Sequence, residues 1–127
     1  MAWNFTADKP IYAQIAERLK QDILSGKHPA GDKLPTVRDL AAEAAVNPNT
    51  MQKAFAELEQ EGLIVTQRTA GRTVTTDNNA LAEARELMLE ELTRDYLQRI
   101  IQMGSTKEDA VRLIEKMKED SRERREN

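Results

Sequence analysis

The chain has 127 residues, 39% of them hydrophobic and 32% charged, with a formal net charge of −3 and no cysteine. This length suits one domain of about 75 residues with an appendage, and the lack of cysteine excludes disulfides, thiolate zinc sites and thiol nucleophiles. No apolar run approaches the roughly 18 residues of a membrane span, so we expect a protein that is not associated with a membrane, and the lack of cysteine fits the cytoplasm.

The first predicted helix covers residues 10–25, and its apolar residues recur every four positions at Ile11, Ile15, Leu19 and Ile23. Pro10 suits a first helical position, and Gly26 suits a C-terminal cap. A turn over residues 29–32 follows. A second, short helix begins its apolar pattern at Leu34 and ends near Ala45.

A third helix opens at Asn47-Pro48, where the asparagine side chain accepts from free N–H groups and the proline takes the first helical position. Its predicted buried stripe consists of Met51, Ala54, Phe55 and Leu58. Gly62 ends this helix. Strands over residues 63–67 and 72–76, joined by a turn at Thr69-Ala70-Gly71, predict a two-strand hairpin.

Two short helices joined by a tight turn and followed by a hairpin predict a winged helix-turn-helix. The fold class is therefore mostly α (α+β), with a DNA-binding domain in residues 1–76. The turn is Ala45-Val46-Asn47, and Val46 is expected to plug between the two helices.

Residues 77–127 form the predicted second domain, a two-helix dimerisation tail. A long helix over residues 80–103 ends at Gly104, and a capping box at Ser105 and Glu108 starts the last helix. The long helix carries an apolar stripe at spacings of three and four residues: Leu81, Ala84, Met88, Leu92, Tyr96 and Ile100. Two helices cannot bury this stripe by themselves, which favours a homodimer. The alternative is a tail that folds back on its own DNA-binding domain.

The third helix has a polar first half that suits the DNA major groove. Asn49, Thr50, Gln52 and Lys53 can point outward while Met51 points inward. Amides read adenine with two hydrogen bonds, threonine bonds phosphate or contacts a methyl group, and lysine neutralises phosphate. The alternative is a solvated amphipathic helix, which the same spacing also gives.

Charge is segregated within residues 1–76, which hold nine basic and nine acidic residues. Residues 44–56 and 62–76 contain no acid, so a surface built from them is locally positive. Arg38 is a candidate phosphate contact, and Arg68 and Arg72 flank the wing turn, with Arg72 a candidate for the minor groove. The predicted DNA-binding residues are Pro35, Thr36, Arg38, Asn47, Pro48, Asn49, Thr50, Gln52, Lys53, Arg68, Thr69, Gly71 and Arg72.

Three segments resemble the GntR family of bacterial regulators: residues 10–15, residues 29–41 with Leu34-Pro35-Thr36-Val37-Arg38-Asp39-Leu40-Ala41, and residues 58–64. The helix opening at residues 46–52 is similar to the YtrA-like subgroup. The resemblance implies a bacterial DNA-binding repressor with a two-helix tail that regulates transporter operons, and a cytoplasmic location associated with the nucleoid. Pro48 stands where the family usually has arginine, and Thr69 and Thr73 replace a glycine and an aromatic residue of the wing. We therefore expect a displaced wing tip shaped by Ala70-Gly71.

Two other classes of function compete with a DNA-binding regulator. An enzyme needs convergent titratable groups, but the one histidine, His28, lies in a turn, and there is no glycine-rich phosphate loop. We expect no catalytic residue, cofactor or metal. A winged helix that binds only proteins has no need of an acid-free recognition helix with Arg38, Arg68 and Arg72. The tail is too short for an effector pocket of several hundred Å³, so the effector stays unknown, and the expected partners are double-stranded operator DNA and a second copy of the chain.

Overall fold

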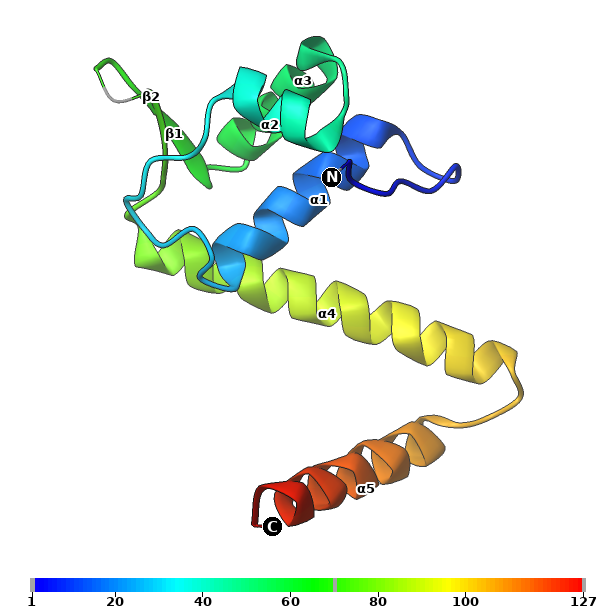
Figure 1. Ribbon diagram of the computed structural model, residues 1–127. Coiled ribbons are helices and arrows are strands. Elements are labelled where there is room, and N and C mark those ends of the chain that lie inside the picture. The colour runs from blue at the N-terminus through cyan, green and yellow to red at the C-terminus, as the bar shows by residue number, and fades with distance from the viewer. Residues whose placement is uncertain (1, 70, 127) are drawn as a thin grey trace. The chain divides into compact units, whose positions relative to one another are not determined.

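The computed structural model describes residues 2–69 and 71–126, with side chains through Ser121. Its elements follow in the order α1 (Ile11–Leu24), α2 (Val37–Ala44), α3 (Pro48–Gln60), β1 (Ile64–Gln67), β2 (Gly71–Val74), α4 (Asn78–Gln102) and α5 (Lys107–Glu126) (Figure 1). The predicted fold class, a winged helix-turn-helix followed by two helices, is confirmed.

Contacts divide the chain into two compact units, Met1–Arg85 and Glu86–Asn127. The first unit includes the start of α4, because Leu81 and Ala84 pack against its core. Arg85 also donates from Nε and Nη2 to the carbonyl oxygen of Leu24, at 3.1 and 2.5 Å. The functional division between residues 76 and 77 stays a prediction.

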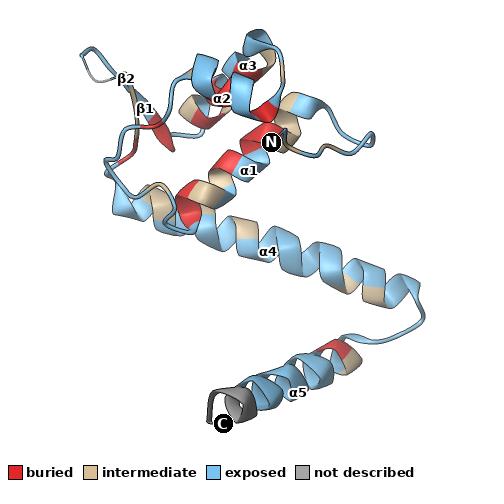
Figure 2. Ribbon diagram, viewed as in Figure 1, coloured by how far each residue is buried: buried red, intermediate tan, exposed pale blue. Residues whose placement is uncertain are grey.

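The core of the first unit lies between α1, α2, α3 and the base of the hairpin (Figure 2). Ile15 and Leu19 come from α1, and the predicted stripe of α3 is confirmed, with Met51, Ala54, Phe55 and Leu58 all buried. Burying one large apolar side chain contributes about 1.5–3 kcal/mol. This core therefore fixes the orientation of α3, whose other face carries the polar residues.

Side-chain caps set where α2 and α3 begin. Thr36 Oγ1 accepts from the Asp39 N–H at 3.0 Å, and Asn47 Oδ1 accepts from the Asn49 N–H at 2.8 Å. The predicted cap at Asn47 is confirmed, with Pro48 as the first helical residue. Pro10, expected inside the first helix, is instead the N-cap of α1, because its ψ of 143° is extended.

The hairpin is antiparallel, with Ile64 opposite Val74 and Gln67 opposite Gly71. Gly71 has a φ of +75°, which a residue without Cβ adopts without strain. Residues 31–34 line the other edge of β2, where the Leu34 N–H donates to the Arg72 carbonyl at 2.9 Å. The predicted turn included Ala70, which lies outside the described residues.

The turn between α2 and α3 contains Ala45 in the left-handed region, with φ 60° and ψ 48°. The Val46 N–H donates to the Ala41 carbonyl at 3.0 Å and closes the end of α2. Val46 is half-buried against the core, as the sequence predicted. A left-handed conformation costs a residue with a Cβ about 1–2 kcal/mol, so this turn holds strain.

We expect Ala45→Gly to leave stability unchanged or raise it by up to about 1 kcal/mol, since relief of strain exceeds the added freedom of the unfolded chain. Ala45→Val is expected to cost at least about 1–2 kcal/mol, because a branched side chain resists positive φ. Urea unfolding measures both. The matched control is Ala42→Gly on the exposed side of α2, which should destabilise by about 1 kcal/mol. Equal destabilisation by the two glycine variants would contradict strain at Ala45.

The second unit contains the rest of α4 and all of α5. Gly104 ends α4 with a φ of +86°. The capping box of α5 differs from the predicted pair by one residue: Thr106 Oγ1 accepts from the Asp109 N–H at 3.1 Å, and Asp109 Oδ2 accepts from the Thr106 N–H at 3.2 Å. Ser105 and Glu108 satisfy the same sequence pattern, but the helix starts at Lys107 and makes Thr106 the cap.

Large apolar side chains stay exposed along both helices of the second unit. The exposed set is Leu87, Leu89, Leu92, Tyr96, Ile101, Met103, Val111, Leu113, Ile114 and Met117. Met88 and Ile100, from the predicted stripe, are half-buried. Within the described part of the chain, no helix combines the length and the apolarity that crossing a bilayer requires.

Candidate nucleic-acid interface

The first half of α3 presents a polar surface to solvent. Asn49, Gln52 and Lys53 are exposed and Thr50 is half-buried, whereas Met51 is fully buried. The amides therefore point away from the core on which the helix rests. This arrangement suits a recognition helix, because the groups that read base edges stand on a rigid base.

The start of α2 adds a second set of exposed residues: Pro35, Thr36 and Arg38. Thr36 and Asn47 use their side-chain oxygens to cap the two helices, so they fix the backbone of the interface as well as line it. Free N–H groups at a helix start favour an anion such as phosphate. Arg38 lies in the first turn of α2 and supplies a positive charge there.

Lys53 has a neighbour that sequence reasoning missed. Its Nζ lies 4.0 Å from the centre of the Tyr12 ring, on α1. A cation over an aromatic face is stabilised by about 0.5–1 kcal/mol at an exposed site. Tyr12 therefore orients the lysine of the recognition helix, a contact that residue spacing could not reveal because the two helices are distant in sequence.

The wing holds its two arginines in different ways. Arg68 and Thr69 are exposed next to the hairpin turn. Arg72 instead lies over α3: its Nε donates to Glu59 Oε1 at 2.5 Å, and its guanidinium carbon is 5.2 Å from the centre of the Phe55 ring. The minor-groove role predicted for Arg72 requires this contact to break, and Arg68 needs no such rearrangement.

Two carboxylates near the end of α3, Glu59 and Glu61, are paired with cations. The hydrogen bond from Arg72 holds the pKa of Glu59 below its ordinary value of 4.5, burial opposes this shift, and the Thr66 hydroxyl adds to it. Glu61 forms an ion pair with Lys20 at 2.8 Å. The spans at residues 44–56 and 62–76 contain no acid, so the exposed carboxylate nearest to Arg38 is that of Asp39, in the first turn of α2.

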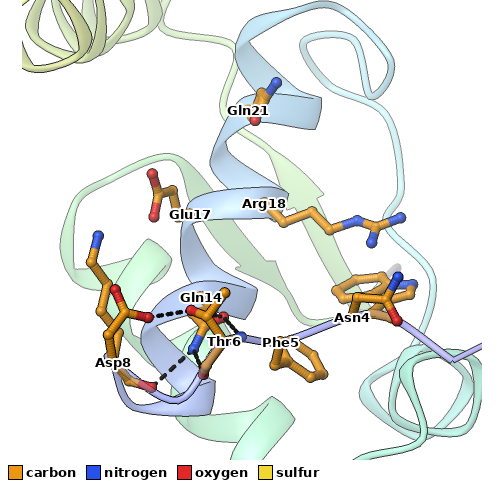
Figure 3. A pocket seen from close by; sticks show the side chains of 10 residues that line it. Asn4, Phe5, Thr6, Asp8, Gln14, Glu17, Arg18 and Gln21 are labelled. Carbon is orange, nitrogen blue, oxygen red and sulfur yellow. Dashed lines mark hydrogen bonds between the residues drawn. The ribbon is translucent and has the colours of Figure 1, made fainter. Parts of the chain in front are cut away.

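A pocket of about 330 Å³ lies between the segment before α1 and that helix (Figure 3). Gln14 holds the segment: its Oε1 accepts from the Thr6 N–H at 2.9 Å, and its Nε2 donates to the carbonyls of Thr6 and Lys9, also at 2.9 Å. The Arg18 guanidinium lies 4.0 Å from the centre of the Trp3 ring. The groups that line the pocket therefore bond to one another, and these bonds hold the segment before α1 against the first turns of that helix.

The unit combines a capped recognition helix with an exposed amide face, a preceding helix with an exposed cation at its start, and a two-strand wing. These features define a helix-turn-helix regulator that binds DNA. The comparisons with known proteins agree. The family described as bacterial regulatory proteins, gntR family, matches residues 11–74. The chain belongs to the GntR family and is a DNA-binding transcriptional regulator.

Several relatives illustrate the match. The chain is 40% identical over 89 residues to the HTH-type transcriptional repressor YtrA of Bacillus subtilis, covering 69% of this chain and 68% of YtrA. A GntR family regulator from Listeria monocytogenes matches with a TM-score of 0.80 and 36% identity, covering 88% of this chain and 98% of the other. The AraR DNA-binding domain, solved with its operator ORX1, matches at a TM-score of 0.53 and 26% identity, covering 59% and 95%.

Membership of the GntR family decides between the competing classes of function. Members of the GntR family regulate transcription and are not enzymes. DNA binding is likewise the property of the class, which disfavours a winged helix that binds only proteins.

Proposed function

We propose that the chain is a repressor that binds a two-fold symmetric operator as a homodimer in the cytoplasm, at a bacterial operon that encodes a transporter. We infer the homodimer from the exposed apolar side chains of the second unit. Soluble monomers rarely expose a contiguous apolar surface of this kind. A second copy of the same chain is the partner that covers it symmetrically.

The dimer surface is assigned to the tail beyond Arg85. Leu92 and Tyr96 of the predicted stripe are 56% and 39% exposed, so their side chains are available to a partner. Leu81 and Ala84 pack against the core of their own chain and anchor the tail instead. On α5, Val111, Ile114 and Met117 repeat every three residues and add to the surface.

DNA contacts are assigned by chemistry. Asn49 and Gln52 read base edges, and Thr50 bonds phosphate or contacts a methyl group. Arg38 and Lys53 neutralise phosphate. Backbone N–H groups at the start of α2, next to Pro35 and Thr36, contact the sugar-phosphate backbone, and Asn47 and Pro48 lie against it at the start of α3. The wing approaches the duplex through Arg68, Thr69 and Gly71.

Repression is the mode of action that the relatives favour. YtrA, 40% identical over the matched region, is described as a repressor. The chain offers a DNA-binding unit and a short helical tail, and a dimer of such units acts by occupying DNA that the transcription machinery needs. The transporter operon is inferred from the YtrA-like resemblance alone.

Arg38→Ala tests the DNA interface. We expect weaker binding to all duplexes by a similar factor, and a salt slope that falls by about one, because one phosphate contact with its released counterion is lost. Fluorescence anisotropy at several salt concentrations measures both quantities.

The matched control is Lys27→Ala, a cation in the turn after α1 that pairs with Asp22 at 3.7 Å. It should leave the salt slope unchanged. A change of base preference with an unchanged slope for Arg38→Ala would contradict its assignment to phosphate.

A further inference from the structure

Glu59 is the centre of a contact that joins the recognition helix to both strands of the wing. Its Oε1 accepts from the Thr66 hydroxyl at 2.9 Å and from Arg72 Nε at 2.5 Å. Thr66 on β1 and Arg72 on β2 are directly opposite each other in the hairpin register. The Glu59 carboxylate therefore binds both members of one cross-strand pair of the hairpin.

Phe55 supplies the second half of the contact. It lies one helical turn before Glu59 on the same face of α3 and is 1% exposed. Its ring packs against the Arg72 guanidinium. The Arg72 side chain is only 25% exposed. A charged hydrogen bond that is partly shielded from water is stronger and more directional than a surface ion pair.

We infer that Glu59 and Arg72 form a latch that fixes the wing relative to the recognition helix, so that Arg72 positions the wing and makes no direct contact with DNA. This inference rests on the proposed function for its effect on DNA binding, since a wing held at one angle meets the duplex without a further ordering cost. The latch itself exists in the protein without DNA.

The first test uses affinity for operator duplex and its salt slope in the full chain. Arg72→Ala should weaken binding about fivefold to tenfold with an unchanged slope, because no phosphate contact is lost. The matched control is Arg68→Ala in the same wing, which should lower the slope by about one. A slope lowered by about one in Arg72→Ala would overturn the latch.

The second test exchanges the charges. Glu59→Arg and Arg72→Glu should each weaken operator binding, and the double variant should recover most of the affinity, because the ion pair is restored in reverse. If Arg72 contacts phosphate, the double variant will bind as poorly as Arg72→Glu alone, and the inference is wrong. If Arg72→Glu does not fold, the milder variant Arg72→Gln takes its place.

Hydrogen exchange in the absence of DNA separates this inference from the proposed function. Amides of Val65 and Gln67, whose N–H groups face β2, should exchange about fivefold to tenfold faster in Arg72→Ala than in the natural sequence, and the charge-exchanged double variant should restore protection. Exchange unchanged by Arg72→Ala would overturn the latch. A natural sequence that binds no duplex DNA would overturn the proposed function and leave the exchange result to decide on the latch.

Discussion

A chain that ends at Arg85 is expected to be a monomer and to bind operator about 100-fold or more weakly than the full chain. Two linked DNA-binding units engage two half-sites with a gain of about 10² to 10⁴ in overall affinity. The truncation keeps Leu81, Ala84 and the bond from Arg85 to the Leu24 carbonyl, so the winged unit retains its own core. Sedimentation and fluorescence anisotropy measure mass and affinity.

A point variant of the full chain separates loss of the dimer surface from any effect of truncation on folding. Leu92→Asp places a charge on the exposed apolar face of α4 and should also give a monomer. Glu91→Gln, at a neighbouring exposed position, should remain a dimer. A truncated chain that still sediments as a dimer would show that the dimer surface lies in residues 1–85.

Replacing both amides of the recognition helix is expected to remove sequence preference. Each base-reading side chain contributes about 1–3 kcal/mol of discrimination, so Asn49→Ala with Gln52→Ala should weaken operator binding by a factor on the order of 100 or more. Binding to random duplex should stay the same, because the phosphate contacts of Arg38 and Lys53 remain. Gln52→Ala alone should relax preference at one base pair in each half-site.

The matched control is Gln60→Ala, which changes the same residue type at the exposed far end of the same helix. It should retain both operator affinity and preference. Competition between operator and random duplex in one titration gives the ratio of the two affinities directly. If the double variant kept the ratio of the natural sequence, base reading would have to come from other residues.

Local patterns predicted most of the fold because each depends on neighbours in sequence. The spacing of Ile15, Leu19, Met51 and Phe55 indicated which face of each helix is buried, and these side chains form the core. Asn47 capped α3 as expected, since a cap needs only the next two residues. Where two caps satisfied one pattern, at Ser105 and Thr106, the sequence could not choose between them.

Contacts between distant segments lay beyond the sequence. A stripe of apolar residues does not say which surface covers it, so Leu81 and Ala84 were assigned to a partner although they pack on their own core. In the same way, an arginine beside a wing turn suggested DNA, whereas Arg72 is bound to Glu59 on α3. The left-handed conformation of Ala45 was also missed, because alanine gives no signal for positive φ.

The most direct test of operator recognition by a dimer is selection of bound duplexes from a random pool with the full chain, followed by sequencing. We expect an inverted repeat whose half-site centres lie about 10–10.5 base pairs apart, or a multiple of that distance, since two recognition helices related by a two-fold axis meet the same face of the duplex. Enrichment of a single asymmetric site, or of no sequence at all, would contradict it.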